Sequence, residues 1–180
     1  MSTPDPNRGE LALLLHSHMP YVEGFGTWPF GEEWLFEAMA GAYLPLIEQC
    51  EEWAQAGERQ VLTIGVTPVL ADQLVLGDVA ERFVRFVRET RAECHRLDIE
   101  GLERAGQADA AEALRRSARD YEHAVDHFEA LGRNLPAALR RLCDVGVVDL
   151  WASAATHAVL PLVATESAIR LQLATGIESH

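Results

Sequence analysis

The sequence predicts an α/β fold built on three parallel strands. Three short apolar runs without a helical period, at residues 10–16, 60–66 and 147–153, read as buried strands. A loop and an amphipathic, helix-like stretch follow each run, and this alternation is typical of a parallel sheet with crossover helices. The chain has 180 residues, of which 48% are hydrophobic, so it can bury one core. We therefore expect one α/β domain that begins either a barrel or an open sheet.

The first unit runs from the strand at 10–16 through a loop rich in glycine and aromatic residues to a helix over 32–56. The apolar residues of this helix recur at spacings of three, four and seven and form one broad face: Leu35, Met39, Tyr43, Leu46, Ile47 and Trp53. Gly57 is expected to end the helix, because glycine readily adopts the left-handed conformation found there.

The second strand, at 60–66, is followed by Thr67 and Pro68, which open a turn into a short helix over 69–74. A long, charged, helical pattern then covers residues 78–131, and we expect Gly101 and Gly106 to break it. With a further helix at 136–143, residues 78–146 form a helical insertion between the second and third strands. The third strand leads into the loop ATHAVLP and a last helix, which begins near Glu166.

Composition excludes several classes of function. The formal net charge is -13, which argues against a nucleic-acid partner or an anionic membrane surface and favours a neutral substrate. All 15 basic residues are arginines, so neither Schiff-base chemistry nor a P-loop phosphate contact has a lysine to use. Cys50, Cys94 and Cys143 are odd in number and far apart, which disfavours a disulfide framework or a zinc knuckle. The beginning of the chain lacks a signal peptide, and no run is apolar enough to span a membrane, so we expect a cytoplasmic protein.

Histidines mark the strand exits. His16 and His18 come at the end of the first strand, and His157 follows the third. The carboxyl ends of parallel strands meet at one edge of a sheet, so we expect these imidazoles to converge on a pocket. Imidazoles in such a place can bind a metal or hydrogen-bond a polar substrate.

Two other readings of these histidines stay open. A His-x-His element at a strand end is also the signature of barrel hydrolases in which both imidazoles, here His16 and His18, ligate zinc. Each histidine could instead be structural and satisfied by backbone partners, although this fits three together poorly. His123 and His127 lie four apart on a helix, but Ala124 stands where a zincin needs glutamate, so we expect a solvated face.

The four tryptophans fall into two groups. Trp28 and Trp34 bracket PFGEE in a segment without helical or strand period, and are candidates to stack on a ligand. Trp53 and Trp151 lie in a predicted helix and a predicted strand, and we expect both in the core.

These motifs resemble a known family. The run LLHSHMPYVEGFGTWPFGEEWLFEAMAGAYLPLIE resembles the N-terminus of family 57 glycoside hydrolases, in particular their α-1,4-glucan branching enzymes. LTIGVTPVLADQL is similar to the family's second strand and turn, and WASAATHAVLPL to its second conserved region. The resemblance covers nearly the whole chain.

The resemblance implies an incomplete (β/α)7 barrel and a retaining mechanism with a Glu nucleophile and an Asp acid/base, without metal or cofactor. The substrate would be an α-glucan such as glycogen or amylose; branching enzymes replace an α-1,4 link by an α-1,6 link. His16 and His157 would line the sugar subsite and Trp34 would be a subsite aromatic. His18, Trp28, Glu32 and Glu33 also match the first motif, with less definite roles.

Two departures from the family bear on function. Ala158 and Val159 follow His157 where the family usually has glycine and an aromatic residue. Neither Glu166 nor Glu178 stands in the context of the family's nucleophile, so the resemblance assigns no catalytic carboxylate to this chain. We therefore expect residues 1–180 to be the N-terminal portion of the catalytic barrel, truncated before the nucleophile motif, inactive alone and in need of the missing C-terminal part. A non-catalytic glucan-binding module is the alternative, and branching, hydrolysis and 4-α-glucanotransfer are not distinguished.

Overall fold

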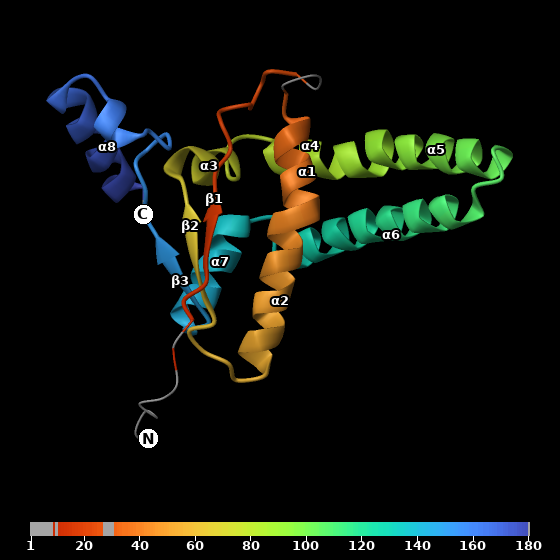
Figure 1. Cartoon of the computed structure of the whole chain (residues 1–180), viewed down its shortest axis with the longest axis horizontal. Helices are drawn as coiled ribbons and strands as arrows, with labels where there is room; N and C mark the ends of the chain where they lie inside the picture. Colours follow the sequence, from red (N-terminus) through yellow and green to blue (C-terminus); the bar gives the residue numbers. More distant parts are fainter. Residues whose placement is uncertain (1–8, 10, 27–30, 180) are drawn as a thin grey trace.

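Three parallel strands form the centre of the structure, a computed structural model that describes residues 9, 11–26 and 31–179. The strands are β1 (Leu14–Ser17), β2 (Leu62–Val66) and β3 (Val148–Trp151), in the order β1-β2-β3 (Figure 1). All pairings are parallel, which confirms the predicted topology of three consecutive parallel strands. The first strand begins later than expected, at Leu14.

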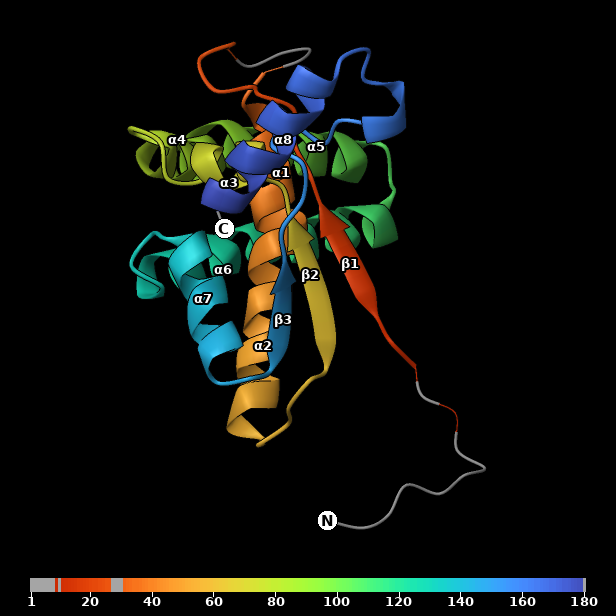
Figure 2. The same ribbon diagram turned by 90° about the vertical axis from the view of Figure 1, so that its left-hand side faces the viewer.

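The two faces of the sheet differ in character. Leu15, Ile64 and Leu150 pair across the strands and belong to the hydrophobic core or pack against it. The next residues along, His16, Gly65 and Trp151, pair in the same way and point to the opposite face, because side chains alternate along a strand. Helix α2 lies behind the sheet in Figure 2, while the near face below α8 carries no helix of the described residues. One face is thus core and the other is available to a ligand or to further protein.

The predicted helix at 32–56 is one continuous helical segment made of α1 (Glu33–Ala38), the π-helical turn η1 (Met39–Tyr43) and α2 (Leu44–Gln55). The face predicted from sequence is the buried face: Leu35, Met39 and Ile47 are at most 1% exposed. Trp53 packs against the core, as expected. Gly57 has φ 82° and follows the helix end, as glycine does at such a position.

The insertion is a helical hairpin that extends away from the sheet (Figure 1). After α3 (Pro68–Gln73), it comprises α4 (Val79–Arg85), η2 (Phe86–Arg91), α5 (Ala92–Arg104) and α6 (Ala108–Ala130), and α7 (Leu135–Asp144) leads back to β3. Gly106, with φ 73°, makes the turn between α5 and α6. The predicted break at Gly101 is wrong: this residue lies inside α5, and its carbonyl accepts the Ala105 N–H in a 3.1 Å helical hydrogen bond.

Helix α8 (Glu166–Glu178) follows a 3₁₀ turn, η3 (Leu160–Leu162), and rests on the loop after β3. The carbonyl of Gln172 accepts the Ala155 N–H at 3.1 Å, and the Gln172 side chain bonds both the N–H and the hydroxyl of Thr156. A Cβ at Gly176 would lie 2.1 Å from the Ser153 carbonyl oxygen, so only glycine permits this approach. Among the described helices, none is both long and apolar enough to cross a membrane.

Candidate active site at the carboxyl ends of the strands

Three imidazoles meet where β1 and β3 end. The ring centroids of His16 and His157 are 4.6 Å apart, and those of His18 and His157 are 4.5 Å apart with only 18° between the ring planes. His16 and His157 are exposed and His18 is half-buried, so the cluster is open to solvent. The predicted convergence of these three side chains is confirmed.

The backbone explains how two of the rings reach this position. His16 pairs with Gly65, and a Cβ on Gly65 would lie 3.4 Å from His16 Nδ1, so the imidazole lies directly over this glycine. His157 has φ 59°, in the left-handed region that a non-glycine residue seldom adopts. Backbone of this kind is held by its surroundings and concentrates at functional sites.

His18 is fixed by a hydroxyl group. Its Nδ1 is 3.1 Å from Oγ1 of Thr67, the residue that follows β2. Burial lowers the pKa of His18, and the neighbouring His157 and His16 lower it further because a second positive charge close by is unfavourable. The ring is therefore held neutral to lower pH than an ordinary histidine.

The loop after His18 is anchored by Gln73, which sequence reasoning did not single out. Gln73 is fully buried in α3. Its Oε1 accepts the N–H of Val22 at 2.7 Å and that of Glu23 at 3.3 Å, and its Nε2 donates to the carbonyls of Pro20 at 3.2 Å and Val69 at 2.9 Å. The Gln73 amide thus supplies the hydrogen bonds that the backbone groups of this loop would otherwise make with water. A polar residue on the apolar face of the short helix VLADQL is the signal that could have revealed it.

A second anchor joins the two acidic residues of the loop to the insertion. Arg82 bonds Glu32 through Nε at 3.0 and 3.1 Å and through Nη2 at 2.6 Å, and also reaches Glu23 at 3.2 Å. Asp78 completes the set. The hydrogen bonds that Arg82 donates to Glu32 raise the pKa of Arg82. Glu32 is 7% exposed and its carboxylate is occupied by this ion pair, so its position in the first motif serves the loop's structure.

The aromatic residues are placed differently from expectation. Trp28 lies outside the described residues, and Trp34 is in the first turn of α1 with 45% of its surface exposed. Trp151, expected in the core, is 57% exposed, so that prediction is wrong. Val148 and Leu150 lie on the face of β3 that packs against the helices. Because side chains alternate along a strand, Trp151 lies on the opposite face, which also carries His16. Strand alternation was the signal for this.

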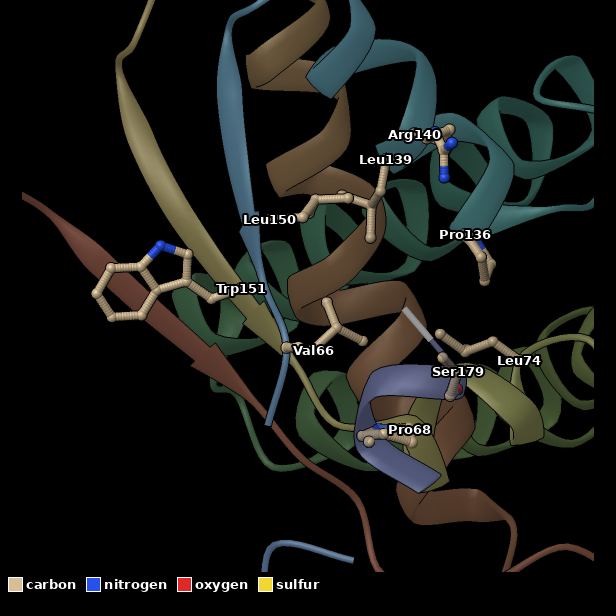
Figure 3. A pocket seen from close by; sticks show the side chains of 12 residues that line it. Val66, Pro68, Leu74, Pro136, Leu139, Arg140, Leu150, Trp151 and Ser179 are labelled. Carbon is tan, nitrogen blue, oxygen red and sulfur yellow. The ribbon is translucent and has the colours of Figure 1, made fainter. Parts of the chain in front are cut away.

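One apolar hollow of the structure does not contain the histidines. A cavity of about 260 Å³ lies between α3, α7 and α8 and is lined by apolar side chains that include Val66, Pro68, Leu74 and Leu139 (Figure 3). In Figure 3 the indole of Trp151 extends away from these side chains, on the far side of β3. None of the three histidines lines this cavity, so the cavity and the imidazole cluster are separate features.

Geometry also bears on the metal-binding readings. In the parts of the chain that the structure describes, no three His, Cys, Asp or Glu side chains are arranged to hold a metal ion. His123 and His127 instead bond Glu48 at 2.7 Å and Glu51 at 2.8 Å, both on α2. The expected solvated face is thus wrong for His127, whose side chain is only 11% exposed and links α6 to α2. The three cysteines are all free.

Residues 12–179 match the sequence model of a family described as "Glycosyl hydrolase family 57". The chain belongs to glycosyl hydrolase family 57. A 1,4-alpha-glucan branching enzyme of Thermococcus kodakarensis is 35% identical over 96% of this chain and 25% of its own length. A probable 1,4-alpha-glucan branching enzyme of Mycobacterium tuberculosis is 33% identical over 91% of this chain and 33% of its own length.

Solved structures of family 57 members have the same fold over this segment. The branching enzyme of Pyrococcus horikoshii superposes with a TM-score of 0.86 at 36% identity, over 95% of this chain and 32% of that chain. The α-amylase AmyC of Thermotoga maritima superposes with a TM-score of 0.78 at 26% identity, over 96% of this chain and 32% of that one. This family 57 chain thus spans a quarter to a third of the length of these relatives.

Proposed function

We propose that this chain is the sugar-binding N-terminal part of a retaining α-glucan-active enzyme, and that the complete enzyme is a 1,4-α-glucan branching enzyme acting on glycogen-like glucan. The observation that carries the proposal is the cluster of His16, His18 and His157 at the carboxyl edge of the sheet, in a chain of this family. The relatives named as branching enzymes support the specific reaction.

The cluster suits a neutral, hydroxyl-rich ligand. A neutral imidazole offers one donor and one acceptor, which matches the hydroxyl groups of a glucosyl ring. In a carbohydrate site such contacts orient the ring so that the bond to be broken faces the catalytic groups. The exposed Trp34 and Trp151, with Trp28 from the first motif, are proposed to cover apolar sugar faces.

The catalytic carboxylates are proposed to come from outside this chain. A retaining enzyme needs two carboxyl groups about 5 Å apart, one to attack the anomeric carbon and one to protonate the leaving oxygen. Glu32 is paired with Arg82 and is unavailable for either role. We therefore expect the 180-residue chain to bind saccharide without turning it over.

The remainder of the proposed (β/α)7 barrel would cover the open face and edges of the sheet. Support comes from large apolar side chains that are exposed on β1, on β3 and on α8, among them Leu14 at 50%, Trp151 at 57% and Ile177 at 74%. Exposed apolar surface and unpaired strand edges favour association with further protein. A non-catalytic glucan-binding module is the second candidate, favoured by the same open cluster and by the ion pair with Arg82 that occupies Glu32.

Two measurements test the proposal. Calorimetric titration of the chain with a maltooligosaccharide should show saturable binding that falls about tenfold in His16→Ala, since the one donor and one acceptor of this imidazole would be lost. His123→Ala removes an imidazole outside the cluster and is the matched control. A protein extended through the rest of the barrel should add α-1,6 linkages to amylose; saccharide binding with neither branching nor hydrolysis by that longer protein would favour the binding module.

A further inference from the structure

Thr67 is the buried residue that contacts the imidazole cluster directly. It is 0% exposed and follows the last residue of β2, and its Oγ1 lies 3.1 Å from Nδ1 of His18. Nothing in the motif around His18 would indicate this partner, which is 49 positions away in the sequence.

The ordinary reason for a threonine at this position does not apply. Thr67 is the N-cap residue of α3, where a threonine side chain usually accepts a backbone N–H of the first turn. Here no such side-chain bond forms, and the backbone carbonyl of Thr67 accepts the N–H groups of Leu70 and Ala71, both at 3.0 Å. The hydroxyl is thus free of the helix and directed to His18.

Both partners are attached to the same pair of strands. The N–H of Thr67 donates to the carbonyl of Ser17 at 3.1 Å, which continues the β1–β2 pairing one step beyond Val66. His18 is the residue after Ser17. The Thr67–His18 bond therefore joins the first side chains beyond two paired strands, and the backbone of each is already fixed.

The direction of this hydrogen bond follows from burial. Within the described residues Oγ1 of Thr67 has His18 as its hydrogen-bond partner and no other. If Nδ1 carried the proton and donated to Oγ1, the threonine hydroxyl proton would be buried without an acceptor, which is unfavourable. If the hydroxyl donates to Nδ1, every group is satisfied and the imidazole proton resides on Nε2. Nε2 has no hydrogen-bond partner among the described residues and is not among their buried unsatisfied atoms, so its proton is left for a ligand.

We propose that Thr67 is a positioning residue whose hydroxyl donates to Nδ1 of His18, holding the ring against His157 and presenting Nε2–H as a donor to a sugar hydroxyl oxygen. The identity of the ligand rests on the proposed function. The protonation of the His18 ring, with the proton on Nε2, does not depend on it. The fixed Nε2–H donor requires a ligand with an acceptor oxygen, and a sugar hydroxyl provides one.

The imidazole nitrogens of His18 in the ¹⁵N-labelled 180-residue chain test the proposal directly. Above the pKa of His18 we expect Nδ1 to be the unprotonated nitrogen, Nε2 to carry the proton, and a slowly exchanging Thr67 hydroxyl proton to show a nuclear Overhauser effect to Hε1 of His18. Thr67→Ser should keep this pattern. Thr67→Val, which is nearly isosteric, should lose the hydroxyl signal and shift Nδ1 downfield, as a nitrogen that loses its donor does. The wild-type spectrum suffices if the valine variant does not fold.

A saccharide titration separates the two proposals. Thr67→Val should weaken maltooligosaccharide binding roughly threefold to tenfold, with Thr67→Ser restoring it, as expected for one hydrogen bond. Protonated Nδ1 in the wild type, or an Nδ1 signal unchanged in Thr67→Val, overturns the positioning role. A wild-type chain that shows the expected ring state and does not bind maltooligosaccharide overturns the proposed function and leaves the positioning role intact.

Discussion

The imidazole of His18 stacks on that of His157, with ring centroids 4.5 Å apart and 18° between the planes. The two residues follow β1 and β3, which do not pair with each other, since β2 lies between them. Two loops must therefore meet over the end of β2, and the left-handed backbone of His157 is part of how the second loop does so.

Two replacements of His157 should differ in their effect on stability but not in their effect on saccharide binding. His157→Gly and His157→Ala both remove the imidazole, but only glycine adopts φ 59° without strain. We expect the glycine variant to be more stable than the alanine variant by about 1 kcal/mol in urea unfolding. Both should lose saccharide affinity equally, and an alanine variant as stable as the glycine variant would show that the backbone is not strained.

Loss of the Gln73 amide should loosen the loop after β1. Gln73→Leu preserves the approximate shape but leaves the N–H of Val22 and the carbonyl of Pro20 without their partner. We expect a loss of about 2 to 4 kcal/mol in the free energy of unfolding and faster hydrogen exchange at Val22. Asp72→Asn, at the exposed neighbouring position, is the control and should be nearly neutral. Unchanged exchange at Val22 would contradict the anchoring role.

The buried ion pair of Arg82 with Glu32 should contribute more to stability than the exposed ion pair of Arg170 with Glu166. Arg82 and Glu32 have side chains that are 18% and 9% exposed, whereas Arg170 and Glu166 are both 77% exposed. Arg82→Met should cost about 3 kcal/mol because it leaves a buried carboxylate unpaired, and Arg170→Met should cost less than about 0.5 kcal/mol. Equal effects in chemical unfolding would refute the structural role assigned to Glu32.

Stability should fall on acidification through the range of ordinary histidines. Burial lowers the pKa of His18, with help from His157 and His16, and burial and the nearby Arg91 lower that of His95. The unfolded chain takes up these protons first, so the free energy of unfolding is complete above about pH 6.5 and decreases below it. The decrease in the free energy of unfolding, measured in urea, should be smaller in His18→Gln and in His95→Gln. A steeper decrease in either variant would show that folding raises the pKa of that histidine instead of lowering it.

Sequence patterns predicted the order and direction of the strands because buried parallel strands are short, apolar and separated by helices. The meeting of His16, His18 and His157 followed from the common exit edge of such strands. The partners Gln73, Arg82 and Thr67 could not be predicted in the same way, since each acts on a loop that is about fifty positions away in the chain. The core position predicted for Trp151 was wrong because alternation along β3, and not apolar character, decides which face a residue occupies. The break predicted at Gly101 was wrong because packing within a long helix can outweigh glycine's flexibility.

The most direct test of the central claim is a titration of the ¹⁵N-labelled chain with a maltooligosaccharide, monitored at the ring nitrogens of its histidines. We expect saturable shifts at His16, His18 and His157, and none at His95, His123 and His127, which lie on α5 and α6. Absence of any saturable shift, or shifts confined to the helical histidines, would contradict a sugar site at the carboxyl ends of the strands.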